Sequence, residues 1–269
     1  MELGPTSALV LLWSGSGLYE TDNAQKFWSK LDLSEGNEIY GICNSVWEGY
    51  GEVIKNRKWR ILSWSKEVLA SGDITQVVII AAGFAPMGIE LASLYPQSSV
   101  FELDKFNMEA KSELCPSIEN LHCITADVTD QAQCQSTLVA HGWNPAKPTL
   151  LVCEGISYYI ADSDSRNMWK LFTLTGSRCI FEYLVPQENI AANRRYIPDG
   201  VFNAILAYCD VTNPITRWSQ ELLEKEGGIK ILKHNCLSDM ELERTGKSDY
   251  FPKADDGWIE IAMFDIGCA

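Results

Sequence analysis

The chain has 269 residues, enough for one large domain or a domain with an insertion, and 46% of them are hydrophobic, as in ordinary globular proteins. Its net charge of -14, from 36 acidic and 22 basic residues, opposes binding to nucleic-acid backbones and to anionic membranes. We therefore expect neither nucleic acid nor membrane as a partner.

Nine cysteines are scattered singly, without a C-x-x-C pair, which argues against a disulfide scaffold and a structural zinc site. No cluster of metal ligands appears in the sequence, so we expect no bound metal. The early apolar run at 8–13 is short and follows Glu2, whereas a signal peptide needs positive charge there. These features predict a cytoplasmic protein.

Residues 1–75 lack a strand pattern and are predicted to form an N-terminal helical cover. Asp22 is expected to cap a helix that ends near Leu31. The segment from 38 to 69 mixes aromatic residues with four basic ones, which are Lys55, Arg57, Lys58 and Arg60.

Residues 76–269 are predicted to form the core, because short apolar runs alternate with helical patterns from residue 76 onwards. The predicted strands are 76–82, 98–104, 121–127, 149–155 and 178–185, and the helices are 87–95, 105–114, 130–140 and 163–175. Asp130 and Ser163 are the expected caps of the last two helices. Repeated strand–helix alternation predicts a parallel sheet with right-handed crossovers.

The segment 186–218 interrupts this alternation. It contains NRRYIPDGVFNAILAYCD, which is rich in aromatic residues and carries two adjacent arginines. We predict a helical insertion here. A helix at 219–227 and two strands, 229–235 and 257–266, follow, and a polar loop is expected between the two strands.

The predicted strand ends present Gly83, Asp104, Asp127 and Glu154 to one edge of the sheet, where open parallel sheets bind ligands. The turn GFAPMG offers only two glycines, and its proline has no N–H, so it suits a phosphate poorly. Asp104 follows Gly83 by 21 residues, a spacing suited to binding ribose hydroxyls. A ligand with a ribose, a positive charge and no phosphate is expected.

S-adenosylmethionine has these properties. Asp104 would accept hydrogen bonds from the ribose diol, and such bonds to a charged acceptor are strong. Asp127 and the Val128 amide would meet the adenine edge, and Glu154 would face the ribose or the methionine end. Gly83 would let the backbone approach the cofactor closely.

Four segments resemble the leucine carboxyl methyltransferases and their bacterial O-methyltransferase relatives. QVVIIAAGFAPMGIEL is similar to the family's first motif, VFELDKFNMEAKSEL to its ribose motif, ADVTD to its adenine motif, and LLVCEGISYYI to its Glu-Gly-x-x-x-Tyr segment. The four matches keep the family's order and spacing across residues 76–160. After the first glycine, however, the family's Asp-Thr-Arg is replaced by Ala85-Pro86-Met87.

The resemblance implies an α/β class I methyltransferase fold, Rossmann-like, with a seven-stranded sheet whose last strand is antiparallel. It also implies that helices at 1–75 cover the site and that 186–218, after the fifth strand, forms a lid over the acceptor. By motif position, the cofactor contacts would be Gly83, Asp104, Asp127, Val128 and Glu154. A basic residue would meet the cofactor carboxylate, with Arg57 as the best match and Arg60 as the next.

The predicted function is S-adenosylmethionine-dependent O-methylation of a carboxylate or hydroxyl on a small molecule, a natural-product intermediate. The resemblance places Tyr159 near the acceptor, and the composition of the insertion favours Arg194 and Arg195 as an anion anchor, with Tyr196 beside them. A biosynthetic carrier protein is a further candidate partner. The alternatives are methylation of a protein C-terminal carboxylate, a nicotinamide-dependent oxidoreductase, and an inactive binding scaffold.

Overall fold

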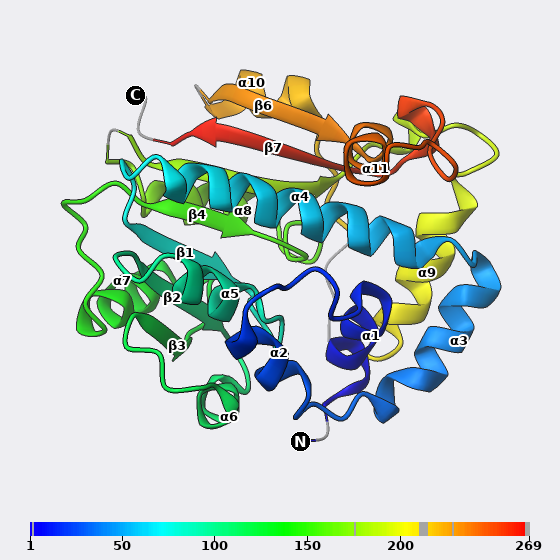
Figure 1. Cartoon of the computed structure of the whole chain (residues 1–269). Helices are drawn as coiled ribbons and strands as arrows, with labels where there is room; N and C mark the ends of the chain where they lie inside the picture. The colour runs from blue at the N-terminus through cyan, green and yellow to red at the C-terminus, as the bar shows by residue number, and fades with distance from the viewer. Residues whose placement is uncertain (2, 175, 210–214, 228, 267–269) are drawn as a thin grey trace.

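The computed structural model describes residues 1, 3–174, 176–209, 215–227 and 229–266, and its centre is a seven-stranded sheet (Figure 1). The strands are β1 Gln76–Ile80, β2 Ser99–Asp104, β3 Leu121–Thr125, β4 Leu150–Cys153, β5 Arg178–Leu184, β6 Lys230–Cys236 and β7 Ile259–Asp265. Their order is β3-β2-β1-β4-β5-β7-β6. Strands β1 to β5 pair in parallel, and β7 runs antiparallel to both β5 and β6. The expected class I methyltransferase fold is confirmed.

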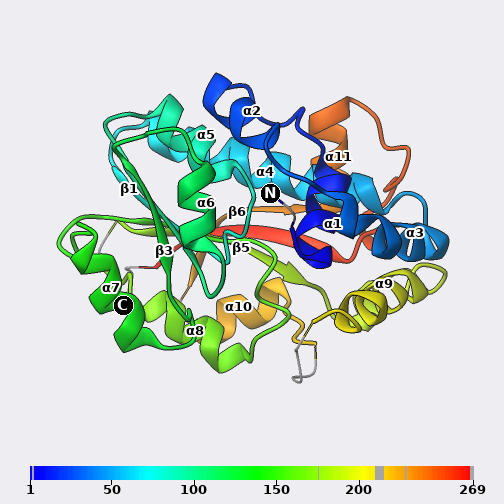
Figure 2. The ribbon, with the colours of Figure 1, turned by 90° about the horizontal axis from the view of Figure 1, so that it is seen from below.

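Helices cover both faces of this sheet. They are α1 Pro5–Ser14, α2 Asp22–Trp28, α3 Asn37–Val46, α4 Tyr50–Ala70, α5 Met87–Leu94, α6 Met108–Leu114, α7 Gln131–Ala140, α8 Asp162–Lys170, α9 Tyr196–Leu206, α10 Gln220–Gly227 and α11 Leu237–Thr245, with the 3-10 turns η1 Ser34–Gly36, η2 Gln187–Asn189 and η3 Ala254–Asp256. Figure 2 shows α4, α5 and α11 on one side of the sheet and α7, α8 and α10 on the other. Every residue of β1 and β4 is buried, as expected for central strands covered on both faces.

The N-terminal helices extend the structure beyond the carboxyl ends of the central strands. The 21-residue helix α4 contacts β4, β5 and β7, while α1 packs on α3 and α4 (Figure 1). The prediction that Asp22 caps this helix was wrong: α2 begins at Asp22 and ends at Trp28, three residues before Leu31, and its cap is Thr21, whose side chain accepts a hydrogen bond from the Ala24 N–H at 3.3 Å.

Of the other two predicted helix caps, one is confirmed and one is wrong. Asp130 caps α7 as expected, since its carboxylate accepts a hydrogen bond from the Gln133 N–H at 3.0 Å. Ser163 does not cap α8, which starts one residue earlier, after Ala161, whose side chain cannot accept a hydrogen bond.

The insertion contributes η2 and α9, and α9 packs against α3 at the end of the sheet. Residues 210–214 of the insertion lie outside the described part of the chain. The prediction of a polar loop between the last two strands was wrong, because α11 and η3 lie there. Asp239 accepts a hydrogen bond from the Cys236 N–H at 3.0 Å at the start of α11, and Leu237 and Met240 are buried beneath it.

Among the described residues, no helix is long and apolar enough to cross a membrane.

Candidate active site

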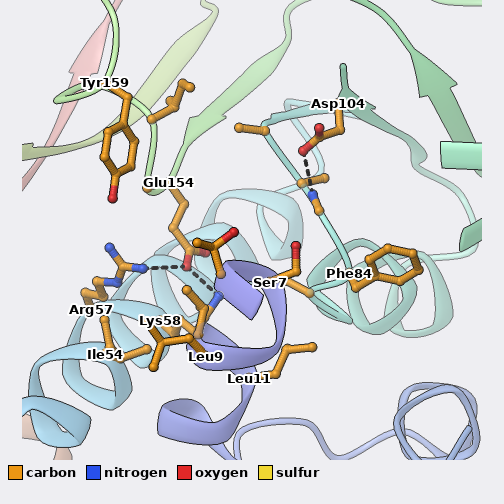
Figure 3. Close-up of a pocket in the computed structure, with 18 of the residues that line it drawn as sticks. Ser7, Leu9, Leu11, Ile54, Arg57, Lys58, Phe84, Asp104, Glu154 and Tyr159 are labelled. Atoms are coloured by element: carbon orange, nitrogen blue, oxygen red, sulfur yellow. Dashed lines mark hydrogen bonds and ion pairs between the residues drawn. The ribbon is translucent and has the colours of Figure 1, made fainter. Parts of the chain in front are cut away.

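A cavity of about 340 Å³ lies at the carboxyl ends of β1, β2 and β4, and residues of α1, α4 and α9 also line it. Figure 3 shows part of this lining. The loop after β1 lines one end of it, and α9 lines the other. Figure 3 shows Glu154 between Asp104 on one side and Tyr159 on the other, with Arg57 and Lys58 rising from α4 below. This is the position at which open α/β sheets bind their ligands.

Asp104 and the backbone of Gly83 form the first end of the cavity. One carboxylate oxygen of Asp104 accepts a hydrogen bond from the Gly83 N–H at 2.9 Å, and the other accepts one from the Phe106 N–H at 3.1 Å. Gly83 has a positive φ of 48°, and a Cβ built on it would meet no atom within 4 Å. The sequence thus leaves open space beside a carboxylate whose oxygens each keep further acceptor capacity.

The N-terminus of α5 is occupied by a carboxylate of the protein itself. Glu102, buried on β2, accepts a hydrogen bond from the Gly88 N–H at 3.1 Å, and a Cβ on Gly88 would lie 2.4 Å from the same oxygen. Lys111 pairs with Glu102 at 2.8 Å and donates to the Ala85 carbonyl at 2.8 Å. This buried pair therefore holds the loop that joins β1 to α5.

Arg57 stands in a buried network at the middle of the cavity. Its guanidinium donates hydrogen bonds to the Tyr158 hydroxyl at 2.8 Å and to the fully buried Glu182 of β5. Glu182 also accepts the Gly155 N–H at 3.0 Å. The Arg57 Nε has no hydrogen-bond partner in the described part of the chain, so a donor remains free in the buried site.

Glu154 is held between two cations of α4. Lys58 Nζ lies 2.5 Å from a carboxylate oxygen of Glu154, and Arg57 lies 3.8 Å from the same oxygen. Burial would raise the pKa of Glu154, but Lys58 and Arg57 lower it below its ordinary value, so the carboxylate is ionised.

The cavity lining also includes aromatic and apolar residues of α1, α4, α9 and the turn after β4, among them Trp13, Tyr50, Tyr159, Phe202 and Ile205. The rings of Trp13 and Tyr50 lie 4.8 Å apart, and those of Tyr159 and Phe202 lie 5.9 Å apart. Burial raises the pKa of Tyr159 far above its ordinary value, and the neighbouring Tyr50 and Cys209 raise it further. The Tyr159 hydroxyl is therefore protonated and able to donate a hydrogen bond.

The structure brings five of the predicted site residues to this cavity, and they are Arg57, Gly83, Asp104, Glu154 and Tyr159. Arg60 does not line it, although it is one turn from Arg57. Its guanidinium pairs with Glu243 of α11 at 2.5 Å and lies 4.6 Å from the centre of the Trp59 ring.

Asp127 and Val128 follow β3 and also lie outside the cavity lining. The Asp127 carboxylate accepts hydrogen bonds from the N–H and hydroxyl of Thr129 and pairs with Lys105 at 3.0 Å. These contacts lower the pKa of Asp127 to about 2. In this arrangement the side chain stabilises its own turn.

Arg194, Arg195 and Tyr196 lie away from the cavity, and their contacts hold the insertion to its neighbours. Arg194 donates a hydrogen bond to the Tyr250 carbonyl at 3.1 Å and lies over the Trp47 ring, while Arg195 donates to the Ile190 carbonyl at 2.9 Å. Tyr196 is 58% exposed. The structure does not place them as an anion anchor.

Sequence reasoning missed Lys58, Tyr158 and Glu182. A lone acid within the apolar run RCIFEYLV was a usable signal for Glu182, because a charge in a fully covered strand must be paired. Nothing in the sequence separates Lys58 from the other bases of α4, because only the contacts between helix and strand ends select it. Among the described residues, no cluster of potential metal ligands is found.

Comparisons with known proteins agree with this geometry. Residues 44–173 match the family described as leucine carboxyl methyltransferase. A DUF574-family protein from Streptomyces avermitilis MA-4680 is 15% identical and superposes with a TM-score of 0.70 over 97% of each chain. A protein from Thermobifida fusca YX, described as a "putative methyltransferase", is 14% identical with a TM-score of 0.65 over 94% of this chain and 98% of its own. Comparison with curated proteins finds no match.

At these identities the two structures show a shared fold, and the family match covers the segment that holds α4, the first four strands and most of the cavity lining. Over residues 44–173, just under half of its length, the chain thus matches the leucine carboxyl methyltransferase family, and its fold is that of a class I methyltransferase.

Proposed function

We propose that this protein binds S-adenosylmethionine and transfers its methyl group to an oxygen atom of a small molecule. The observation that carries the proposal is the opposition of Asp104 and Arg57 across one cavity, with Glu154 between them (Figure 3). A carboxylate suits the ribose diol, a guanidinium with a free buried N–H suits the methionine carboxylate, and Glu154 suits the ammonium group. The open space at Gly83 accommodates close approach of the ligand to the backbone.

When bound, the cofactor supplies a methyl group made electrophilic by its sulfonium. The protein's own part is to hold the two reactants in line and to exclude water, and such positioning lowers a barrier by about 7–11 kcal/mol in favourable cases. Tyr159 lines the cavity, and its protonated hydroxyl is available to donate a hydrogen bond to the acceptor. Helix α1 lines the cavity with six of its residues, Thr6, Ser7, Leu9, Val10, Leu11 and Trp13, and so reduces its contact with bulk solvent.

The same site disfavours a dinucleotide. A pyrophosphate needs free N–H groups at a helix N-terminus. Here the Gly88 N–H at the start of α5 already donates to Glu102, and the negative charge of Glu102 would repel a phosphate. This supports a methyl donor over a nicotinamide cofactor. In this chain the loop that carries Ala85-Pro86-Met87 is held by Lys111, which pairs with Glu102 and donates a hydrogen bond to the Ala85 carbonyl.

Calorimetric titration with S-adenosylhomocysteine and with NAD tests the proposal. We expect micromolar or tighter binding of S-adenosylhomocysteine and no binding of NAD. Asp104→Ala should weaken the binding of S-adenosylhomocysteine by about 1–3 kcal/mol, and Asp104→Asn by less, because charge-assisted hydrogen bonds are lost. Asp73→Ala, which removes an exposed carboxylate before β1, is the matched control. Binding of NAD alone, or equal affinities of all variants, would refute the proposal.

A further inference from the structure

We infer that Glu182 and Tyr158 are positioning residues for Arg57: they fix one end of its guanidinium so that the other edge is left for the amino-acid end of the methyl donor. The inference rests on the proposed function, in which Arg57 binds the carboxylate of that ligand. Glu182 is fully buried and does not line the cavity, so it can act on a ligand only through another residue.

The Nη1 end of the Arg57 guanidinium is held by two partners. It donates hydrogen bonds to the Tyr158 hydroxyl at 2.8 Å and to Oε1 of Glu182. The Tyr158 hydroxyl in turn donates to the same Glu182 oxygen at 3.2 Å, so the three groups form a closed triangle. All three side chains belong to residues that are at most 4% exposed. Because a guanidinium is planar and rigid, two contacts at one end fix the orientation of the whole group.

The opposite edge of the guanidinium, formed by Nε and Nη2, keeps its capacity to donate. Nε is buried without a hydrogen-bond partner in the described part of the chain, and Nη2 is 3.8 Å from Glu154, which is too long for a hydrogen bond. The N–H bonds of Nε and Nη2 are parallel, and such an edge binds both oxygens of a carboxylate. A buried donor without a partner is costly, so a ligand oxygen at this edge would be favoured.

Glu182 also fixes the turn that follows Glu154. Its Oε2 accepts a hydrogen bond from the Gly155 N–H at 3.0 Å, and its backbone carbonyl accepts one from the Ser157 hydroxyl at 2.6 Å. Gly155 follows Glu154 directly in the chain. One buried side chain therefore holds both Arg57 and the backbone beside Glu154, the two groups proposed to bind the carboxylate and the ammonium of the ligand.

The loss of the Glu182 charge should misdirect Arg57. Among the described residues, Glu154 and Glu182 are the two carboxylates that pair with Arg57. A buried cation without a paired carboxylate is costly, so Arg57 would turn onto Glu154 and occupy the group that is proposed to bind the ammonium. Both contacts to the amino-acid end would then weaken. Asp104 lies across the cavity from Arg57 and would keep its contact with the ribose (Figure 3).

Two matched ligands test the inference by calorimetry, S-adenosylhomocysteine and methylthioadenosine. Methylthioadenosine keeps the adenosine and the sulfur but lacks the amino-acid end, so its affinity does not depend on Arg57. We expect the unaltered protein to bind S-adenosylhomocysteine at least about tenfold more tightly than methylthioadenosine, because charge-assisted hydrogen bonds are added.

Glu182→Gln removes the charge and keeps the size of the side chain. It should weaken the binding of S-adenosylhomocysteine by at least about tenfold and leave that of methylthioadenosine unchanged. Tyr158→Phe removes one hydroxyl of the triangle and should produce a smaller loss of the same kind. A residue that served the fold alone would not change the ratio of the two affinities.

A matched control and a double variant complete the test. Glu241 is also buried and accepts hydrogen bonds from the N–H groups of Tyr250 and Phe251, away from the cavity lining. Glu241→Gln should change neither affinity. If Glu182 acts through Arg57, adding Glu182→Gln to Arg57→Met should weaken S-adenosylhomocysteine no further than Arg57→Met alone.

The possible results separate this inference from the proposed function. A rise in the affinity of Glu182→Gln for S-adenosylhomocysteine would show that Glu182 competes with the ligand for Arg57, and an equal fall for both ligands would show a structural role. Either result, or an unchanged affinity, overturns the inference alone, as do equal affinities of the unaltered protein for the two ligands. If Glu182→Gln does not fold, an unchanged affinity ratio in Tyr158→Phe overturns it. If the unaltered protein does not bind S-adenosylhomocysteine, the proposed function fails as well.

Discussion

At the residue scale, the backbone after β1 adopts an unusual conformation at two positions. Ala81 has a φ of 54° and Gly83 a φ of 48°, both in the left-handed region, and both residues line the cavity. Glycine takes this conformation freely, whereas a residue with a Cβ pays about 1–2 kcal/mol. Ala81 is therefore a strained position inside the candidate active site.

We expect Ala81→Gly to maintain the free energy of unfolding or raise it by up to about 1 kcal/mol, because relief of the strain outweighs the added flexibility of the unfolded chain. Ala92→Gly within α5, where the backbone is helical, is the matched control and should lower stability by about 1 kcal/mol or more. Urea unfolding of the three proteins measures this. Equal losses in both variants would show that Ala81 is not strained.

The sequence predicted some site residues correctly and others wrongly. Asp104 and Glu154 could be predicted because each ends a recognisable strand, and the topology of a parallel sheet brings strand ends together. Arg194 and Arg195 could not be excluded, because a pair of adjacent arginines reads the same whether it binds an anion or, as here, backbone carbonyls. Their partners are more than fifty residues distant in one case, and local in the other.

At the scale of elements, the predicted strands agree with the observed ones to within two residues at each end, because buried parallel strands are continuous apolar runs. Helix α11 was missed, since its polar outward face makes a short segment look like a loop. Its helix is stabilised by contacts that only the fold supplies: buried Glu241 accepts hydrogen bonds from the N–H groups of Tyr250 and Phe251.

The second prediction concerns the buried ion pair that holds the loop from β1 to α5. Lys111 of α6 and Glu102 of β2 are buried together, at 0% and 1% side-chain exposure, and both bind this loop. Lys111→Met leaves Glu102 charged and unpaired, so we expect a loss of about 3–5 kcal/mol in the free energy of unfolding. Urea unfolding measures the loss.

The double variant Glu102→Gln with Lys111→Met distinguishes an ion-pair effect from a packing effect. The glutamine can still accept the Gly88 N–H, and no buried charge remains, so much of the lost stability should return. A double variant as unstable as Lys111→Met alone would show that the stability came from packing around the lysine stem.

At the scale of the whole molecule, one wall of the cavity is supplied by α1, a segment remote in sequence from the sheet. The connection from α1 to α2 is fastened to α5 by Glu90, which is fully buried and accepts hydrogen bonds from the N–H groups of Glu20 and Thr21 at 3.1 and 3.0 Å and from the Thr21 hydroxyl at 2.7 Å. Lys66 of α4 lies 3.4 Å from the same carboxylate. One side chain thus joins the cover to the core.

The charge of Glu90 makes this fastening dependent on pH. Burial would raise the pKa of Glu90, but the hydrogen bonds from Glu20 and Thr21 and the charge of Lys66 lower it below its ordinary value. A carboxyl group with a lowered pKa in the folded state stabilises the fold above its ordinary pKa, and that contribution is lost as the pH falls through the folded pKa. The fastening is therefore intact at neutral pH and released only in acid.

The last prediction follows from this geometry: Glu90 holds the connection from α1 to α2 against the core, so its removal should loosen the N-terminal cover. Glu90→Ala should speed amide hydrogen exchange in residues 5–28 at neutral pH and leave exchange in β1 and β4 unchanged, because local opening of the cover does not unfold the sheet. Glu67→Gln, which removes an exposed carboxylate that pairs with Lys233, is the control and should leave 5–28 as protected as before. Saturating S-adenosylhomocysteine should slow exchange in 5–28 in every variant, since a ligand that contacts α1 favours the closed form. Unchanged protection of 5–28 in Glu90→Ala would show that the packing of α1 on α3 and α4 holds the cover closed without the carboxylate.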